Sequence, residues 1–103
     1  MIHIDMKRDK HKHFCGFTVS GHADYNEAGN DVVCSAVSAL AQTALLGMLR
    51  YSDEDQVLYE QKDGFLSAFA MNGNEAIRVI LGTMVLGLEQ IARQYPEYAE
   101  LHL

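Results

Sequence analysis

The first twenty residues alternate between apolar and polar positions. Ile2, Ile4 and Met6 are separated by single polar residues, which is the pattern of a half-buried strand. Residues 8–11 are polar and predict a turn, and the alternation then resumes over residues 12–20. We therefore expect these two segments to pair as a β-hairpin.

A long apolar run follows a glycine-containing loop at residues 21–30. From Val32 to Leu49 the chain carries no charged residue, and its apolar positions are spaced over nearly all sides of a helix. The sequence predicts a helix over residues 31–50 with Asp31, a favourable N-cap residue, at its start. A helix of this kind lies centrally in a core or is shared with a partner.

The second half of the chain repeats this order of elements without a clear sequence repeat. Residues 57–61 and 65–71 predict a second hairpin around Asp63-Gly64, a strong signal for a tight turn. A second helix is expected over residues 75–95, ended by Pro96. The predicted fold is α+β, in the order ββαββα, with two long helices packed on a four-stranded antiparallel sheet.

Size and composition set limits on the class of protein. The 103 residues fit one domain, residues 1–103, and a net charge of −6 argues against nucleic acid as a direct partner. Two cysteines do not form a disulfide framework, so a reducing cytoplasmic compartment is expected. No signal peptide is recognisable, and we interpret the apolar helix as buried in a soluble protein rather than inserted in a membrane.

Cys34 and His22 are the candidate reactive residues. The predicted helix places Cys34 in its first turn, where partial positive charge and free amide donors favour a thiolate. His22, in the preceding loop, is placed to take the thiol proton as a general base and later to act as an acid. The alternatives are a buried apolar cysteine and a surface histidine. The chemistry alone predicts a cysteine hydrolase that needs no cofactor or metal, with helix-start amides near Cys34 as the oxyanion donors.

Of four further candidate residues, Asp31 and Ser38 have two interpretations each. Asp31 either orients His22 as the third member of a triad or simply caps the helix. Ser38 lies one turn after Cys34 on the same face, where it either hydrogen-bonds substrate or bonds back to a helix carbonyl. Gly21 and Gly29 provide backbone freedom, and we expect them to act as loop hinges.

The segment from Gly21 to Leu40, GHADYNEAGNDVVCSAVSAL, resembles the signature of the ribosomal-processing cysteine protease family, Prp. The family pattern is a histidine, a short loop, and then Gly-x-Asp-aliphatic-aliphatic-Cys-small-small-Val-Ser. The matching residues are His22, Gly29, Asp31, Cys34, Val37 and Ser38. The resemblance implies a bacterial cytoplasmic endopeptidase, a homodimer, that removes the N-terminal extension of a large-subunit ribosomal protein.

Two competing functions remain open at this point. A metal-binding protein is suggested by the alternating His11, His13 and Cys15, with His3 across the hairpin, because imidazole and thiolate are good zinc ligands. A dimeric adaptor that binds a ribosomal protein without cutting it would also explain the apolar surface. For the protease, the aromatic residues Tyr25, Phe65 and Phe69 are candidates for an apolar substrate groove, although aromatics at this spacing are commonly core.

Overall fold

The computed structural model describes residues 1–21 and 28–103, except the side chains of residues 28–31 and 54. Within these residues the chain forms two α-helices, five strands and one 3-10 turn. The elements are β1 (Ile2–Arg8), β2 (Phe14–Ser20), α1 (Ala28–Arg50), a 3-10 turn (Glu54–Gln56), β3 (Val57–Lys62), β4 (Phe65–Ala70), α2 (Glu75–Gln94) and β5 (Ala99–His102). The predicted ββαββα order is confirmed, with one strand added at the end.

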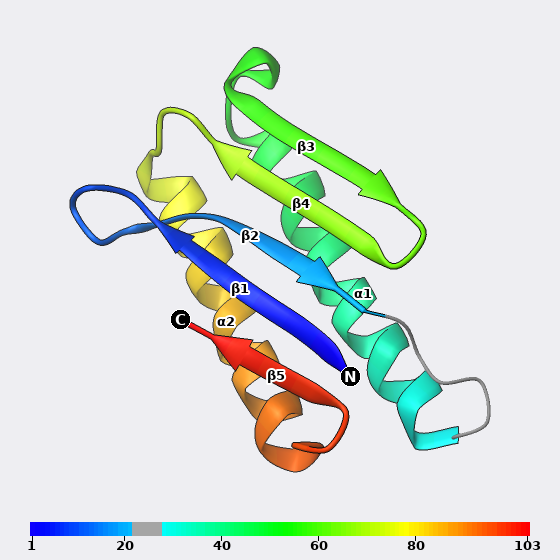
Figure 1. Ribbon diagram of the computed structural model, residues 1–103. Coiled ribbons are helices and arrows are strands. Elements are labelled where there is room, and N and C mark those ends of the chain that lie inside the picture. The colour runs from blue at the N-terminus through cyan, green and yellow to red at the C-terminus, as the bar shows by residue number, and fades with distance from the viewer. Residues whose placement is uncertain (22–27) are drawn as a thin grey trace.

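The strands form a mixed sheet in the order β3-β4-β2-β1-β5 (Figure 1). Both hairpins are antiparallel as predicted, and β2 pairs with β4 at the centre. The prediction of a four-stranded, wholly antiparallel sheet is wrong in one respect, because β5 adds to the free edge of β1 in parallel. This strand has only four residues, too few for an alternating pattern to stand out in the sequence.

Helices α1 and α2 cover one face of the sheet, and the opposite face is open to solvent (Figure 1). The core lies between these two layers and is apolar. Its largest fully buried side chains are Phe17, Ile2, Ile4, Met48, Ile77, Leu81, Leu88, Val33 and Val37. Inward and outward residues alternate along β4, where Leu66, Ala68 and Ala70 are buried and the residues between them are half-buried.

The two helices pack around an approximate two-fold axis that relates residue i of α1 to residue i+40 of α2. A methyl group built on Gly47 would meet Ile80 Cδ1 at 3.2 Å, and one built on Gly87 would meet Leu40 Cδ1 at 3.0 Å. Gly47 corresponds to Gly87, and Leu40 corresponds to Ile80, each pair being 40 residues apart. The two glycine contacts are therefore equivalent in the two helices. Residues 41–50 and 81–90 also share the same sequence of buried and exposed positions. Glycine at both places allows the helices to approach closely.

Helix α1 begins three residues earlier than the sequence pattern predicted. It starts at Ala28 rather than Asp31, so Asp31 is the fourth residue of the helix and not its N-cap. Gly29 lies in the first helical turn, and its predicted role as a loop hinge is therefore wrong. The pattern was misleading because the polar and acidic residues before Val32 are typical of a helix cap, whereas here they form helix.

The apolar part of α1, Val32–Arg50, has the length and composition of a membrane-crossing helix, with a mean hydropathy of 1.8. The core helix of a globular domain has the same properties. In this structure Val37, Ala41 and Met48 of α1 are buried in the core. The sequence had predicted this burial of the apolar helix in the protein core.

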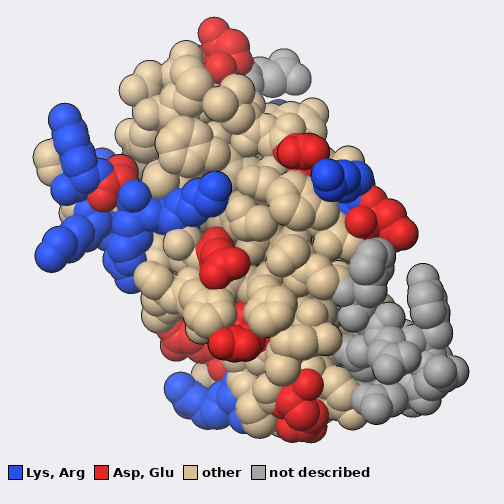
Figure 2. Space-filling view, in the orientation of Figure 1, with Lys and Arg blue, Asp and Glu red and all other residues tan. Residues whose placement is uncertain are grey.

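Charged side chains are distributed unevenly over the open face of the sheet (Figure 2). Lysine and arginine gather at the end of the β1–β2 hairpin, where residues 7–12 include Lys7, Arg8, Lys10 and Lys12. Within this hairpin, the Arg8 guanidinium lies over the ring of Phe14, 4.3 Å from its centroid, and donates a hydrogen bond to the Lys12 carbonyl. Four of the eight basic residues of the chain therefore lie in this one hairpin.

Candidate active site

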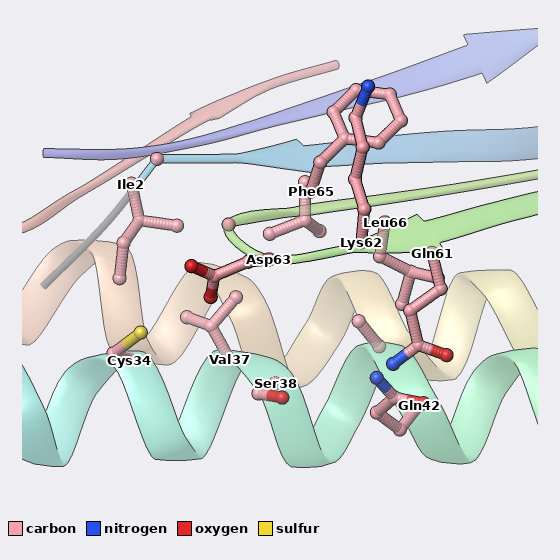
Figure 3. Close-up of a pocket in the computed structure, with 14 residues that line it drawn as sticks. Ile2, Cys34, Val37, Ser38, Gln42, Gln61, Lys62, Asp63, Phe65 and Leu66 are labelled. Atoms are coloured by element: carbon pink, nitrogen blue, oxygen red, sulfur yellow. The ribbon is translucent and has the colours of Figure 1, made fainter.

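A cavity of about 370 Å³ opens beside Cys34, between α1 and the turn that joins β3 to β4 (Figure 3). Helix α1 forms its floor, the β3–β4 turn forms its roof, and the ends of β1 and β2 close one side. Its described lining residues are Ile2, Val19, Gly21, Cys34, Val37, Ser38, Ala41, Gln42, Gln61, Lys62, Asp63, Gly64, Phe65 and Leu66. The predicted site residues Cys34, Ser38 and Gly21 thus line one cavity.

Cys34 is half-buried on α1, with its sulfur directed toward the sheet and the β3–β4 turn (Figure 3). It is the seventh residue of α1 rather than a first-turn residue, so that prediction is wrong. The effect of a helix dipole falls off within the first turn, and a seventh-residue amide bonds to a carbonyl inside the helix. Neither thiolate stabilisation nor oxyanion donors near Cys34 can therefore come from a free helix start.

Cys15, the other free cysteine, lies in a different environment. It is only 4% exposed, at the irregularity in the β1–β2 pairing. Burial raises the pKa of the Cys15 thiol, and the negative charge of Asp9 raises it further. Cys15 is therefore a core residue in its neutral form, and Cys34 is the cysteine that a substrate can reach.

Gly21 joins the end of β2 to the cavity and must be glycine. Its φ of +116° lies in a region that residues with a side chain rarely adopt. A Cβ atom there would also lie 2.3 Å from the Met1 carbonyl oxygen. The Gly21 amide donates a hydrogen bond to the Gly64 carbonyl at 3.1 Å. This bond ties the start of the residue 22–27 connection to the β3–β4 turn.

The β3–β4 turn supplies polar groups that the sequence predicted only as a turn. Lys62 pairs with Phe65 in the ladder, so Asp63 and Gly64 form a two-residue loop as expected. The Asp63 carboxylate points down toward α1, beside Cys34 and Val37 (Figure 3). No local motif signals this role, because it depends on the turn being folded over α1.

Two glutamines line the far end of the cavity, one on each side of it. Gln42 lies two turns after Cys34 on α1, and Gln61 faces it from β3 (Figure 3). Their amide groups can each donate and accept hydrogen bonds. An isolated glutamine has no distinguishing sequence pattern, so these residues were also missed.

The aromatic groove predicted from the sequence is not formed by Phe65 or Phe69. Phe65 lines the cavity near the turn, but its ring points to the opposite side of β4, away from α1 (Figure 3). There the Lys62 ammonium lies 5.2 Å from the centroid of the ring and 3.5 Å from the Glu60 carboxylate. Phe69 is four residues further along the same face of β4, and Tyr25 lies outside the described residues.

Ser38 is exposed and lines the cavity one helical turn after Cys34. Among the hydrogen bonds of the described residues, none joins its hydroxyl to a preceding helix carbonyl. Thr83 of α2 does make such a bond, to the Val79 carbonyl at 2.7 Å. The Ser38 hydroxyl is therefore available to a molecule in the cavity.

His22 lies outside the described residues, and so does the side chain of Asp31. Their roles remain predictions from the sequence. The described part of the site therefore comprises the thiol, the cavity and its polar lining. It also includes Gly21, where the connection that contains His22 begins.

The predicted metal set of His11, His13 and Cys15 does not come together. Cys15 is buried, while His13 precedes β2 and pairs with Asp9 at 3.9 Å. The expected alternation fails because the strand begins at Phe14, after both histidines. Of the four residues in that prediction, His3 alone belongs to a described group with metal-ligand geometry, and its neighbours there come from β5.

The family model described as "Cysteine protease Prp" matches residues 1–100 of the chain. The ribosomal processing cysteine protease Prp of Staphylococcus aureus strain Mu50 is 27% identical over 106 residues, covering 99% of this chain and 98% of that protein. The protein of the same name from Bacillus subtilis strain 168 is 25% identical, covering 94% of this chain and 92% of its own.

Solved structures agree with this assignment. The S. aureus Prp protease in complex with a substrate peptide superposes with a TM-score of 0.87 and 25% identity, over 99% of this chain and 98% of that one. The complex of that protease with a covalently linked product peptide gives a TM-score of 0.84 and 26% identity over the same shares. With a reachable cysteine beside a cavity, the chain is a cysteine protease rather than a non-enzymatic adaptor, and it belongs to the Prp family.

Proposed function

We propose that this protein is an endopeptidase that removes the N-terminal extension of a large-subunit ribosomal protein. The observation that carries this proposal is Cys34 opening on a cavity of about 370 Å³ that is lined by apolar residues and by several hydrogen-bonding side chains. The S. aureus relative is described as an essential ribosomal processing protease and has been solved with a substrate peptide and with a covalently linked product peptide. A covalent product is what attack by a cysteine thiolate would leave.

In this proposal Cys34 is the nucleophile and His22 is the general base and acid. His22 takes the thiol proton, and the Cys34 sulfur attacks the scissile carbonyl carbon to form a tetrahedral oxyanion. The C–N bond then breaks as the imidazolium gives its proton to the leaving amine, which leaves an acyl thioester on Cys34. Water, deprotonated by His22, hydrolyses the thioester and releases the second product.

Activation of the thiol must come from His22, because Cys34 lies beyond the first turn of α1. An ion pair with an imidazolium is the established alternative means of stabilising a thiolate. Asp31 is no longer needed as an N-cap, so we assign its carboxylate to orienting His22 as the third member of a triad. The connection over residues 21–27 is what would bring the imidazole to the sulfur, and the Gly21–Gly64 hydrogen bond fixes one end of it.

We propose that the cavity holds the peptide in an extended form along α1. Ser38 donates a hydrogen bond to the substrate near Cys34, while the Asp63 carboxylate accepts one from a peptide N–H across the cavity. Gln42 and Gln61 bind the peptide backbone further from the thiol. Such bonds would fix the scissile carbonyl relative to the sulfur and would depend little on the substrate's side chains.

Cleavage of the extended ribosomal protein tests this function directly. Under reducing conditions, the purified protein should release the N-terminal extension at one bond, identified by mass spectrometry of both products. Cys34→Ala provides the matched inactive enzyme, and a ribosomal protein without its extension provides the matched substrate control. If a correctly folded wild-type protein leaves the extended substrate intact, this assignment of substrate is wrong.

We further propose that the enzyme is a homodimer in the bacterial cytoplasm. The free cysteines Cys15 and Cys34 fit a reducing compartment. Exposed apolar residues form a band on the outer side of the two helices, with Val32 and Leu46 on α1 and Val79 and Leu86 on α2, each at least 60% exposed. Val32 and Leu46 are fourteen residues apart and Val79 and Leu86 are seven apart, which puts each pair on one face of its helix. A second copy of the chain would bury this band.

Leu46→Glu should convert the dimer to a monomer, because it places a charge in the proposed interface. Leu58→Glu is the matched control, since Leu58 is similarly exposed but lies on β3. Light scattering coupled to gel filtration measures both masses. A wild-type monomer at micromolar concentration would contradict the dimer while leaving the proteolytic function intact.

A further inference from the structure

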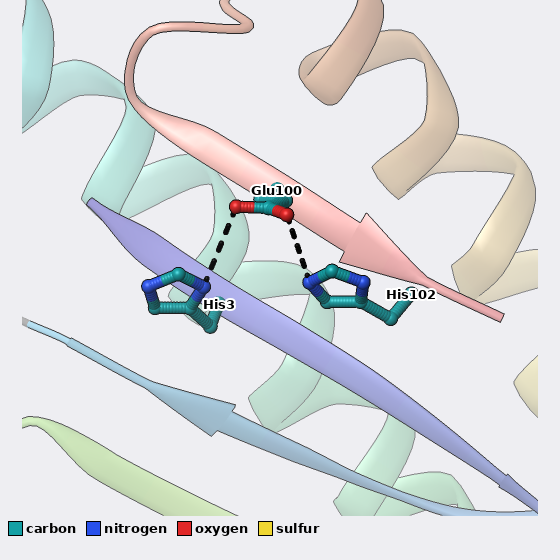
Figure 4. A group of neighbouring side chains, drawn as sticks. All are labelled: His3, Glu100 and His102. Atoms are coloured by element: carbon teal, nitrogen blue, oxygen red, sulfur yellow. Dashed lines mark ion pairs between the residues drawn. The ribbon is translucent and has the colours of Figure 1, made fainter.

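Two histidines and a glutamate converge on the open face of the sheet, where β5 pairs with β1 (Figure 4). The parallel register sets His3 of β1 opposite Glu100 of β5. His102 follows Glu100 by two residues and therefore points to the same face of the sheet. All three side chains are about half exposed, at 46%, 49% and 50%.

The three side chains are oriented around one shared space. Figure 4 shows the Glu100 carboxylate with His3 on one side and His102 on the other. His3 Nδ1 lies 3.7 Å from Glu100 Oε2, and His102 Nε2 lies 3.1 Å from Glu100 Oε1. The two imidazole rings are nearly parallel, with 14° between their planes and 6.4 Å between their centroids.

These separations suit a tetrahedral metal ion. Zinc binds imidazole nitrogen and carboxylate oxygen at about 2.0–2.2 Å, which puts neighbouring ligand atoms about 3.3–3.6 Å apart. With one ligand atom from each residue, the three donor atoms lie within 4.8 Å of one another, and the contacts of 3.7 and 3.1 Å, one to each Glu100 oxygen, are close to this range. Two nitrogens and one oxygen favour zinc and similar transition metals over magnesium or calcium, which prefer oxygen alone.

We propose that His3, Glu100 and His102 form a binding site for Zn²⁺ or a chemically similar divalent transition metal. His3 Nδ1, His102 Nε2 and a Glu100 oxygen are the protein ligands, and water completes the coordination. The site is separate from the catalytic cavity, because these side chains lie on the open face and α1 covers the other. It does not rest on the proposed proteolytic function.

The position of the site gives the ion a structural role. β5 is a four-residue edge strand, and it is joined to the sheet only through β1. A metal bound by both strands would link the C-terminal segment to the N-terminal one by side chains as well as backbone hydrogen bonds. A ligand that binds only the folded state stabilises it by mass action, so the unfolding temperature should rise with metal concentration.

Metal titration of the full chain tests the proposal, and the Cys34→Ala background keeps the catalytic thiol from binding the probe. Metal-free protein is titrated with Zn²⁺ by calorimetry and with Co²⁺ by visible absorption, where tetrahedral cobalt absorbs strongly. We expect one equivalent per chain and a zinc-dependent rise in unfolding temperature. His3→Ala and His102→Ala should each weaken binding by about tenfold or more and remove the rise.

His13→Ala is the matched control, because His13 also pairs with an aspartate, but among the described residues it belongs to no group of three metal-ligand side chains. It should bind zinc as the parent does. Glu100→Gln, which keeps the shape of the side chain, should weaken binding even if an alanine variant folds poorly. The proposal is overturned if no saturable binding occurs, if His3→Ala and His102→Ala leave it unchanged, or if His13→Ala abolishes it.

Discussion

The two ββα halves of this protein share a packing scheme but differ at the connection from sheet to helix. In the second half, residues 71–74 lead directly from β4 into α2, and Asn74 caps the helix by accepting a hydrogen bond from the Ile77 amide at 2.8 Å. In the first half, residues 21–27 intervene between β2 and α1. The longer connection contains His22.

The helices differ in the same place. Under the 40-residue correspondence, the first residue of α2, Glu75, is equivalent to Ser35 of α1. The residues Ala28–Cys34 therefore extend α1 beyond anything in the second half. The proposed reactive residues all lie in this extension or in the connection before it, while the second half contributes the turn that closes the cavity. The repeated parts build the core, and the unmatched part carries the chemistry.

The sharpest test of this division is to remove each cysteine in turn. Cys34→Ala should lower kcat/KM for the junction peptide by about 10³-fold or more, because no other group can form the thioester. Cys15→Ala should retain activity, because Cys15 is buried in the repeated core. The measurement is cleavage rate at equal concentrations of folded protein. Substantial activity in Cys34→Ala would show that Cys34 is not the nucleophile.

Alkylation supports the same distinction without a substrate. Iodoacetamide reacts with thiolates, and burial raises the pKa of Cys15. Raising the pKa keeps the thiol protonated to higher pH, so labelling of Cys15 should require more alkaline conditions or unfolding. Cys34 should be labelled first at neutral pH, as followed by peptide mass spectrometry. Faster labelling of Cys15 would contradict the assignment.

Asp31→Asn tests whether the extension carries a triad or only a Cys–His pair. If Asp31 orients His22, this change should lower kcat by about 10²–10⁴-fold and alter the pH–rate profile. Stability should change little, because α1 begins at Ala28 and Asp31 does not cap it. Asp53→Asn, beyond the other end of α1, controls for the loss of one negative charge. Full activity in Asp31→Asn would remove Asp31 from the catalytic residues.

Gly21 and Gly73 compare the two connections directly. Gly21→Ala should lower the free energy of unfolding by about 1–3 kcal/mol, because alanine disfavours the φ of +116° and its Cβ would collide with the Met1 carbonyl. Gly73→Ala meets nothing within 4 Å and should be neutral or stabilising by up to about 1 kcal/mol. Denaturant unfolding measures both. Equal effects would mean that Gly21 is not structurally required.

Much of the repeated framework could be predicted from the sequence, because alternation and helix spacing report burial directly. The hairpins, the Asp63-Gly64 turn and the second helix were all predicted within one or two residues. The first helix was predicted three residues too short, because Asp31 has the character of an N-cap that the structure does not use. β5 was missed because four residues give no readable period and its partner, β1, is almost a whole chain length away.

In the candidate site, too, the residues of a local motif were predicted and those that depend on tertiary contacts were not. Cys34 and Ser38 were found because they belong to a contiguous motif on one helix face. Asp63, Gln42 and Gln61 were missed because their common cavity depends on folding the second hairpin over α1, which local pattern does not encode. Phe65 was misjudged for a related reason, since its ring direction depends on which face of β4 meets the helices.

The smallest effect is expected at Ser38, where the extension meets the repeated part of α1. Ser38→Ala should lower kcat/KM by about 2- to 10-fold, the equivalent of one uncharged hydrogen bond, with unchanged stability. Ser35→Ala is a matched control on the same helix, because Ser35 is also exposed but does not line the cavity. Peptide cleavage kinetics separate the two variants. If both behave like the wild type, Ser38 makes no productive contact with substrate, and the chemistry of α1 is confined to the residues that the second helix lacks.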